Sequence, residues 1–363
     1  MNALTRRIVV GTAVVSISFT MAACGKAGDD KKNDGGGSKD KSIGLLLPDS
    51  VTPRYEKFDR PLIEKKIKEL CPDCSVQYAN AAGDAAKQAQ QVATMITKGV
   101  KVLILDPQDA VGIQSSVQAA VDKGIKVVAY DRLAQGPVSA YVSYDNEKVG
   151  ELQGESLLKA LGPKATPTAK IVMIDGDPAD PNAAAFKAGA HKALDTKVKV
   201  AYEQTGLWKA DVAAQKMSAA ITQLGKKNIV GVYSANDTMA GGIATSMKGN
   251  GINLPLTGQD AALDGVQRII AGTQTSTIYK PGGPETAPAA EIAVDLLNGK
   301  DFKSLATASS KSGSGENVPS VLLAPISVTI DNLKDTVLKD QAYTVAQVCT
   351  SEFADACKAA GIQ

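Results

Sequence analysis

Two stretches, KGVKVLILD at residues 98–106 and KGIKVVAYD at residues 123–131, decide the fold class of this chain. Each begins with Lys-Gly, a pair typical of a helix end, because lysine lies near the last helical carbonyls and glycine adopts a positive φ without strain. Each then continues as an apolar run that ends in aspartate. Continuous apolar strands that alternate with helices indicate parallel sheets covered on both faces. The two stretches therefore predict successive βα units of an α/β fold.

The same alternation continues along the chain from Ser42. Predicted strands span residues 43–47, 76–79, 100–105, 125–130, 141–144, 171–174, 198–202, 229–233, 254–257, 275–279 and 321–323. Predicted helices span residues 54–70, 84–97, 109–123, 146–161, 182–194, 209–224, 238–250, 262–271 and 285–297. Asp84 and Asp109 are predicted N-caps. At 363 residues the chain is longer than one ordinary domain, so two domains are expected.

The charge and histidine content exclude several classes of function. The 40 basic and 38 acidic residues give a net charge of only +2, so no nucleic-acid partner is expected. One histidine, His191, argues against histidine metal sites and against Ser-His or Cys-His catalysis. Residues 175–180 superficially resemble a calcium loop, but they lack its sixth-position glycine and distal glutamate. Neither a metal nor a cofactor is predicted.

Motifs of common enzymes are missing as well. The sequence holds no phosphate-binding Gly-x4-Gly-Lys loop, no Gly-x-Gly-x-x-Gly that opens a helix, and no Gly-x-Ser-x-Gly elbow. Asp131 and Asp260 could form a carboxylate pair as in a hydrolase. Arg132 and Lys280, which also follow predicted strands, would instead hold both carboxylates ionised. The sequence therefore predicts a protein that is not an enzyme.

The N-terminal residues carry the pattern of an export signal. Arg6 and Arg7 precede an apolar stretch, residues 8–20, about as long as a signal-peptide core. The sequence MAAC at residues 21–24 follows and resembles a bacterial lipobox, in which the cysteine is acylated. The alternative is an ordinary signal peptide with a chance cysteine.

These observations predict a signal peptide at residues 1–23 and a flexible linker at residues 24–41. The linker starts at the lipidated Cys24 and holds no large apolar side chain. The protein is expected outside the cytoplasm, anchored to the outer face of the cell membrane.

The other four cysteines are Cys71, Cys74, Cys349 and Cys357. An even number in an oxidising compartment indicates two disulfides, for which three pairings are possible. Local pairing, Cys71–Cys74 and Cys349–Cys357, is favoured. The alternative for Cys71 and Cys74 is a redox motif or half of a zinc site.

Polar side chains follow almost every predicted strand, where ligands of parallel sheets bind. They are Asp106, Asp131, Arg132, Asp145, Asn146, residues 175–182, residues 204–208, Asn236, Asp237, Gln259, Asp260 and Lys280. An aspartate in such a place often only caps the next helix, but arginine, glutamine and lysine are not preferred caps. Carboxylates that accept, cations that donate and amides that do both suit a neutral polyhydroxylated ligand. The single tryptophan, Trp208, also follows a strand, which favours a stacking platform over a core position.

Five longer motifs resemble a known family. They are YDR at residues 130–132, SYDNEKVGEL at 143–152, SAND at 234–237, GQDA at 258–261, and AGTQT at 271–275 leading to YKP at 279–281. Together they resemble the D-xylose-binding proteins of bacterial ABC importers, within the type I periplasmic sugar-binding family. The resemblance extends from Ser42 to about Lys339, and the tail beyond Asp340 has no counterpart.

The resemblance implies a ligand site and a ligand. The implied binding residues are Arg54, Tyr55, Asp131, Arg132, Asp180, Asn182, Trp208, Asn236, Asp260 and Lys280. Tyr55 stands where the family often carries tryptophan. The implied ligand is a monosaccharide, D-xylose first and glucose, arabinose or ribose as alternatives, with Tyr55, Phe58 or their neighbours filling the space around the missing sixth carbon.

The resemblance also implies an architecture and partners. Two doubly wound parallel-sheet lobes are joined by three crossings, near Asp145, Tyr279 and Ala324. The N-terminal lobe comprises residues 42–145 and 280–324, and the C-terminal lobe residues 146–279 and 325–363. A monomer that closes on its sugar delivers it to a membrane permease. The alternative is a sugar-sensing ectodomain that partners a membrane receptor.

Overall fold

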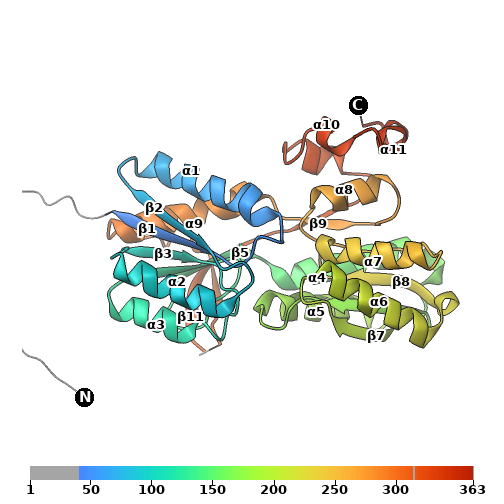
Figure 1. Ribbon diagram of the computed structural model, residues 1–363, viewed down its shortest axis with the longest axis horizontal. Coiled ribbons are helices and arrows are strands. Elements are labelled where there is room, and N and C mark those ends of the chain that lie inside the picture. The colour runs from blue at the N-terminus through green and yellow to red at the C-terminus, as the bar shows by residue number, and fades with distance from the viewer. Residues whose placement is uncertain (1–40, 314, 363) are drawn as a thin grey trace, which may run out of the picture. The chain divides into compact units, whose positions relative to one another are not determined.

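The computed structural model describes residues 41–362 apart from residue 314 (Figure 1). The predicted signal peptide, the predicted lipidation site Cys24 and all but the last residue of the predicted linker lie outside the described residues. Within the described part of the chain, no helix is both long and apolar enough to cross a membrane.

The N-terminal lobe is built on a seven-stranded sheet in the order β10-β11-β5-β4-β3-β1-β2. Its strands are β1 Ser42–Leu47, β2 Ser75–Asn80, β3 Val102–Leu105, β4 Lys126–Tyr130, β5 Ala140–Tyr144, β10 Ala308–Lys311 and β11 Asn317–Leu323. All neighbours are parallel except the antiparallel pair β10 and β11. The strands of the two opening motifs, β3 and β4, lie side by side with Val102 opposite Lys126.

Helices cover both faces of this sheet, as continuous apolar strands require. Helices α1 Arg60–Leu70 and α9 Gly282–Leu297 lie on one face, and α2 Ala85–Thr97 and α3 Gln114–Asp122 on the other (Figure 1). Strand β1 serves both cores because successive side chains point to opposite faces. Leu45 packs in the core under α1 and α9, whereas Leu46 packs in the core under α2 and α3.

The C-terminal lobe is built on three parallel strands in the order β7-β6-β8. They are β6 Lys170–Asp175, β7 Lys199–Thr205 and β8 Ile229–Ser234. Helices α4 Asn146–Leu161, α5 Pro181–Leu194, α6 Ala210–Leu224 and α7 Asp237–Gly249 pack around this sheet in one apolar core. The parallel sheets with helices on both sides confirm the predicted fold class.

The predicted strand 254–257 is wrong, because the structure has only one parallel bridge there, between Val232 and Leu256. Pro255 carries no N–H group and can only accept, which it does from the Val232 N–H at 2.8 Å. A regular ladder therefore does not extend through this segment.

The chain passes between the two lobes three times. It crosses from β5 to α4, from β9 Thr277–Tyr279 to α9, and from β11 to β12 Ile326–Val328. Strands β9 and β12 pair with each other in an antiparallel ribbon and not with either large sheet.

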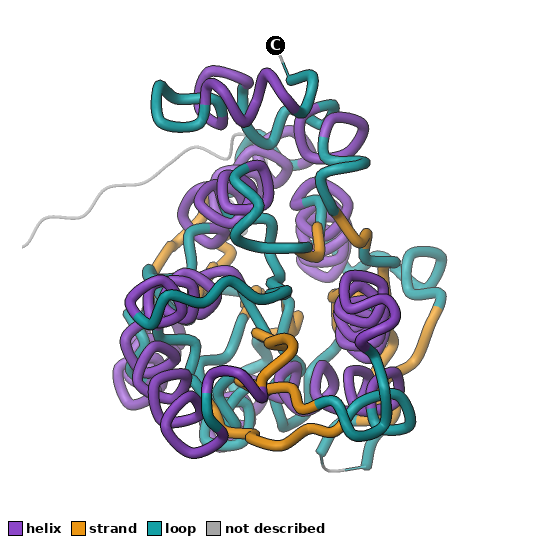
Figure 2. The backbone as a smooth tube through the Cα atoms, turned by 90° about the vertical axis from the view of Figure 1, so that its right-hand side faces the viewer, coloured by secondary structure: helices purple, strands orange, loops and turns teal. Residues whose placement is uncertain are grey.

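The C-terminal segment consists of short helices joined by loops (Figure 2). They are the π-turn Lys334–Leu338, α10 Val345–Val348 and α11 Ala354–Ala359, and they pack with α8 Leu263–Ile270 in one apolar cluster. Tyr343 of this segment contacts Phe58 edge to face, with ring centres 5.9 Å apart. The Lys57 ammonium lies 3.6 Å from the centre of the Tyr343 ring.

Both disulfides form locally, Cys71–Cys74 and Cys349–Cys357, as favoured from the sequence. Cys71 follows the last residue of α1, so this pair closes a helix instead of opening one. Cys71, Asp73 and Cys74 form the one group of candidate metal ligands among the described residues, and the disulfide occupies both of its thiols.

Two predicted helices begin differently. The predicted helix 54–70 starts with a π-helical turn, Tyr55–Asp59, before α1. The predicted helix 109–123 starts only at Gln114, because the Asp109 carboxylate accepts the N–H groups of Val111 and Gly112 and closes a separate turn. Asp84 does cap α2, accepting the Lys87 N–H at 3.0 Å.

Candidate functional site

All ten side chains proposed as ligand contacts line one cavity between the lobes. The lining residues are Thr52, Arg54, Tyr55, Asp131, Arg132, Asp180, Asn182, Phe186, Trp208, Asn236, Gln259, Asp260 and Lys280. Asp131, Arg132, Asn236 and Lys280 follow strands closely, and most of the others lie in the loops or helix starts beyond strand ends, which meet at one edge of each sheet. The free volume among these side chains is about 20 Å³. One water molecule requires roughly 10–15 Å³, so a sugar enters only if the lobes or side chains move.

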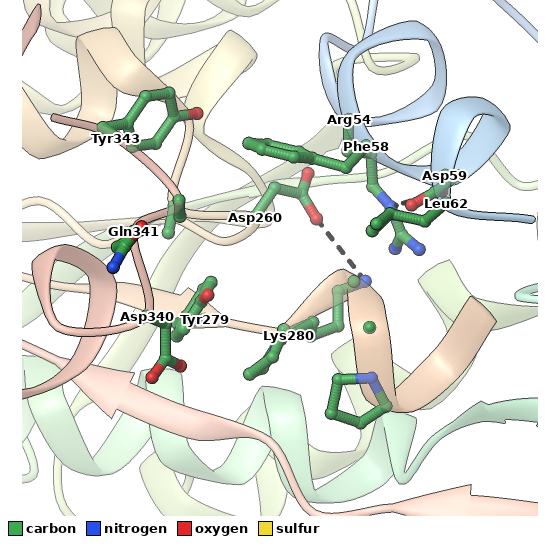
Figure 3. A pocket seen from close by; sticks show the side chains of 16 residues that line it. Arg54, Phe58, Asp59, Leu62, Asp260, Tyr279, Lys280, Asp340, Gln341 and Tyr343 are labelled. Atoms are coloured by element: carbon green, nitrogen blue, oxygen red, sulfur yellow. Dashed lines mark hydrogen bonds and ion pairs between the residues drawn. The ribbon is translucent and has the colours of Figure 1, made fainter. Parts of the chain in front are cut away.

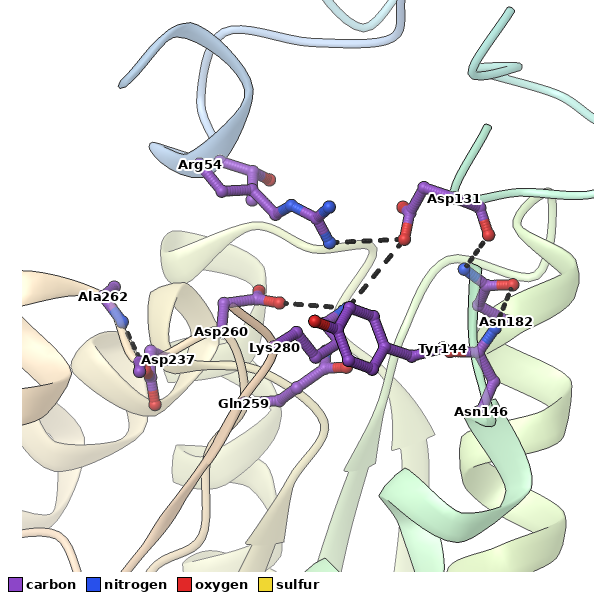
Figure 4. Close-up of polar contacts among 12 residues, drawn as sticks. Arg54, Asp131, Tyr144, Asn146, Asn182, Asp237, Gln259, Asp260, Ala262 and Lys280 are labelled. Carbon is purple, nitrogen blue, oxygen red and sulfur yellow. Dashed lines mark hydrogen bonds and ion pairs between the residues drawn. The ribbon is translucent and has the colours of Figure 1, made fainter. Parts of the chain in front are cut away.

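Asp131 occupies the centre of the polar network (Figure 4). Its Oδ1 lies 3.2 Å from the Arg54 Nη1 and 3.9 Å from the Lys280 Nζ, and its side chain is almost fully buried. Burial alone would raise the pKa of Asp131, but Arg54, Lys280 and Arg132 outweigh it and hold the pKa below its ordinary value. The carboxylate is therefore ionised at neutral pH and acts as a hydrogen-bond acceptor.

Arg54 pairs with two further carboxylates besides Asp131. Its Nε donates to Asp59 at 3.0 Å, and its Nη2 donates to Glu285. Glu285 is fully buried and its Oε1 has no hydrogen-bond partner within the described chain. Burial, together with the neighbouring Asp131 and Asp59, raises the pKa of Glu285 to about 8 despite Arg54. The Arg54 guanidinium thus contacts three carboxyl groups, of which Glu285 holds a proton at neutral pH.

This raised pKa makes the free energy of unfolding depend on pH, and Glu285→Gln should weaken that dependence. A carboxyl whose pKa rises from 4.5 in the unfolded chain to about 8 in the folded protein favours folding below pH 4.5 and loses that contribution as pH rises towards 8. Glutamine imitates the protonated form at every pH. The fall in the free energy of unfolding from pH 5 to pH 8 should be roughly 1–3 kcal/mol smaller in the variant than in the wild type. Urea titrations at each pH measure it.

Glu291→Gln, a partly exposed change on the same helix α9 whose carboxylate pairs with Lys66, is the matched control. Parallel stability–pH curves for wild type and Glu285→Gln would contradict the assignment of a bound proton to Glu285.

Arg132 joins the two lobes at the second half of the site. Its Nε lies 2.8 Å from the Asp180 Oδ2, and its Nη2 donates to the Tyr55 hydroxyl at 3.2 Å. Its Nη1 donates to the Pro107 carbonyl at 3.1 Å, and Asp106 lies behind it, fully buried. The Arg132 guanidinium is therefore fixed in place, because each of its nitrogens faces a protein oxygen.

Asn182, held by Asn146, forms a second bridge between the lobes. The Asn182 amide donates to the Asp131 carbonyl at 3.0 Å and accepts from the Asn146 amide at 2.9 Å (Figure 4). Asp180 accepts the backbone N–H of Asn182 at 2.8 Å and so caps α5. Asp180 is thus both a helix cap and part of the cavity wall.

Trp208 lies against the site in a constrained backbone. Leu207 and Trp208 both have positive φ, 54° and 58°. The Trp208 ring meets Phe186 edge to face at 6.3 Å and covers Gly176, where a Cβ atom would overlap it. The Trp208 Nε1 is buried without a hydrogen-bond partner in the described structure. A ring held by its backbone and neighbours is suited to stack on the C–H face of a sugar.

Backbone strain concentrates around this cavity. Among the described residues, seven non-glycine residues have positive φ, and five of them belong to the site or directly adjoin it: Asp131, Leu207, Trp208, Asp260 and Ala261. Such conformations cost of order 1–3 kcal/mol each and persist where function requires them.

The remaining predicted residues come from the C-terminal lobe and the crossing strands. Asn236 accepts the Met239 N–H at 2.9 Å and caps α7. The Asp260 Oδ1 lies 3.4 Å from the Lys280 Nζ, and Lys280 follows β9 (Figure 4). These residues complete an alternation of acceptors and donors around the cavity.

Five residues of this region were not among the predicted contacts. Thr52, Phe186 and Gln259 line the cavity, while Asp59 and Glu285 hold Arg54. The position of Gln259 after the predicted strand 254–257 was the one available signal. Phe58 does not line this cavity and lies in a neighbouring one.

Each of the three carboxylates that line the site lies beside a cation, and the single histidine lies elsewhere. His191 lies outside the cavity, between Asp195 at 2.7 Å and Glu203 at 3.3 Å. Paired acceptors and donors beside an aromatic ring can bind hydroxyl groups and C–H faces, and the arrangement is that of a binding site.

A domain model, the sequences of known proteins and solved structures all indicate the same family. Residues 43–301 match the periplasmic binding protein domain. The D-xylose-binding periplasmic protein of Haemophilus influenzae is 38% identical over 316 residues, which cover 85% of this chain and 92% of that protein. The protein of the same name from Escherichia coli is 38% identical over 312 residues, covering 84% and 91%.

A solved structure extends the similarity to three dimensions. An ABC transporter solute-binding protein from Clostridium phytofermentans, with bound β-D-glucose, has a TM-score of 0.77 at 26% identity and covers 85% of this chain and 100% of that chain. With a domain match and two relatives at 38% identity over most of its length, the chain belongs to the type I periplasmic sugar-binding proteins, which are binding proteins of transport and not enzymes.

Proposed function

We propose that this chain is the extracytoplasmic substrate-binding lipoprotein of an ABC sugar importer and that it binds a monosaccharide, D-xylose first, between its lobes. The observation that carries the proposal is the meeting of ten polar and aromatic side chains from both lobes in one cavity. The two relatives at 38% identity, named for D-xylose binding, support the choice of sugar. Another aldose, such as glucose, arabinose or ribose, is the alternative.

Each side chain has a role that follows from its chemistry. Asp131 and Asp260 accept hydroxyl protons, Arg54, Arg132 and Lys280 donate to hydroxyl oxygens, and the amides of Asn182 and Asn236 do both. Trp208 stacks on the C–H face of the ring, and Tyr55, which holds Arg132, limits the space for a sixth carbon. Burial of a sugar removes its hydration, so nearly every hydroxyl needs a partner.

Binding is coupled to closure of the lobes. The proposed lobes, residues 42–145 with 280–324 and residues 146–279 with 325–363, separate to admit the sugar. The contacts Arg132–Asp180 and Asn182–Asp131 join the lobes, and contacts with the hydroxyl groups of the sugar would replace them. Sugar contacts from both sides stabilise the closed form by their differential affinity for it. A permease then recognises that form, while acylated Cys24 keeps the protein, as a monomer, at the membrane.

The proposal is tested by titration of residues 25–363 with D-xylose, D-glucose, D-ribose and L-arabinose. Trp208 is the only tryptophan, so its fluorescence reports directly on the cavity. A saturable change that is tightest for D-xylose is expected, with calorimetry as the second readout. If no sugar produces heat or a fluorescence change, the proposed ligand class is wrong.

A further inference from the structure

A second and larger cavity lies directly beside the sugar site (Figure 3). Four segments line it: residues 54–62 at the start of α1, residues 260–261, residues 279–284, and residues 340–343 of the C-terminal segment. Its volume is about 560 Å³, within the roughly 300–1,000 Å³ of small-molecule sites. We name it the outer cavity.

The outer cavity adjoins the sugar site through shared residues. Arg54, Asp260 and Lys280 line both cavities. They form the wall between the cavities, where Lys280 lies 3.4 Å from the Asp260 Oδ1 and Arg54 lies 3.2 Å from the Asp131 Oδ1. Where these ion pairs separate, a substituent on the sugar atom nearest Asp260 and Lys280 would extend into the outer cavity. The sugar site has about 20 Å³ of free volume and the outer cavity about 560 Å³, so most of the free space beside these residues lies in the outer cavity.

The lining of the outer cavity suits a sugar ring. The partly buried Phe58 supplies aromatic surface, the largely buried Tyr279 and Tyr343 add small parts of their rings, and Asp340 and Gln341 line the cavity beside them (Figure 3). Sugar rings combine apolar C–H faces with hydroxyl groups, so aromatic side chains beside carboxylates and amides match them. Asp59 also belongs to this wall, is buried, and its Oδ1 has no hydrogen-bond partner in the described chain. A hydroxyl donor that reached it from the cavity would satisfy it.

Two consecutive glycines keep the outer cavity open. Gly282 and Gly283 begin α9 and line the cavity without side chains. A Cβ atom at Gly283 would meet no atom within 4 Å, so a side chain can begin there without a clash.

We propose that the outer cavity is a second subsite that takes the next ring of a short sugar chain, so that the protein binds a disaccharide across both cavities. This inference rests on the proposed function. The first ring lies between Asp131 and Trp208, and the second ring lies against Phe58 in the outer cavity.

The experiment is calorimetric titration of the soluble protein with D-xylose and with the β-1,4-linked disaccharide of D-xylose. This disaccharide has one ring extended at C1 and the other at C4, so it tests both orientations of the first ring. We expect the disaccharide to bind at least as tightly as D-xylose. The variant Gly283→Leu should weaken the disaccharide by tenfold or more and leave D-xylose within about twofold.

Gly249→Leu is the matched control, because Gly249 also has no atom within 4 Å of a built Cβ and lies at the end of α7, away from both cavities. If D-xylose binds and the disaccharide does not, the second subsite is refuted while the proposed function stands. An equal loss of both ligands in Gly283→Leu, or of neither, also refutes it. If neither sugar binds the wild type, both proposals fall together.

Discussion

Replacing Asp131 with asparagine should weaken D-xylose binding about 100-fold. The carboxylate balances the buried cations Arg54 and Lys280 and, in the proposed complex, accepts sugar hydroxyl protons. Loss of one partner of a buried charged contact costs roughly 2–5 kcal/mol, and about 1.4 kcal/mol corresponds to a tenfold change in affinity. Calorimetric titration of wild type and variant measures the ratio of dissociation constants.

Asparagine is the appropriate replacement because Asp131 has a φ of 56°. Asparagine tolerates this left-handed conformation, whereas alanine would add backbone strain to the loss of charge. The Asp131 carbonyl, which accepts from Asn182, Tyr141 and Ser143, remains in either case. The loop therefore keeps its anchors, and the affinity change reports on the carboxylate.

Asp211→Asn, the same chemical change at an exposed position in the first turn of α6, is the control and should leave affinity unaltered. A dissociation constant of Asp131→Asn within about threefold of the wild type would remove Asp131 from the ligand contacts.

Elements with strong local signals were predicted almost to the residue. Strand β4 was expected at 125–130 and spans Lys126–Tyr130, and α4 was expected and found at residues 146–161. Its start is set by the Asp145 carboxylate, which accepts the Lys148 N–H at 3.0 Å. Strand β10 was missed because ASSK carries little apolar pattern, and β12 because ISV is only three residues long; their partners β11 and β9 determine them.

The residues of the site also fall into those that the sequence predicts and those that it does not. The predicted contacts mostly follow strands, and the parallel topology alone brings strand ends together. Glu285 lies 231 positions after Arg54 in the sequence, and nothing local distinguishes it from any other acidic residue in the first turn of a helix. The protonated carboxyl and the outer cavity depend on tertiary packing, which a single sequence does not display.

The second large effect is expected from Gly150→Ala, which should destabilise the protein by about 3 kcal/mol or more. Helices α4 and α5 approach so closely that a Cβ atom at Gly150 would overlap the Phe186 carbonyl, and one at Gly189 would overlap the Glu147 carbonyl. Both obstacles are backbone atoms, which cannot rotate away as a flexible side chain does. The melting temperature should fall by roughly 5–10 °C in a calorimetric scan.

Gly249→Ala is the matched control, since a Cβ atom at this end of α7 meets nothing within 4 Å. Alanine there removes unfolded-chain entropy and should leave stability equal or up to about 1 kcal/mol higher. Equal melting temperatures for Gly150→Ala and Gly249→Ala would show that α4 and α5 can separate without cost.

The helix contact at Gly150 also connects stability to binding. Asn146 begins α4, Asn182 and Phe186 lie on α5, and the Asn146–Asn182 hydrogen bond of 2.9 Å spans the two helices beside the cavity. A Gly150→Ala protein that folds must hold α4 and α5 further apart, because the new Cβ atom displaces the Phe186 backbone. Phe186 in turn contacts Trp208. D-xylose affinity should therefore fall together with stability in Gly150→Ala, whereas a destabilising change remote from this helix pair should lower stability alone.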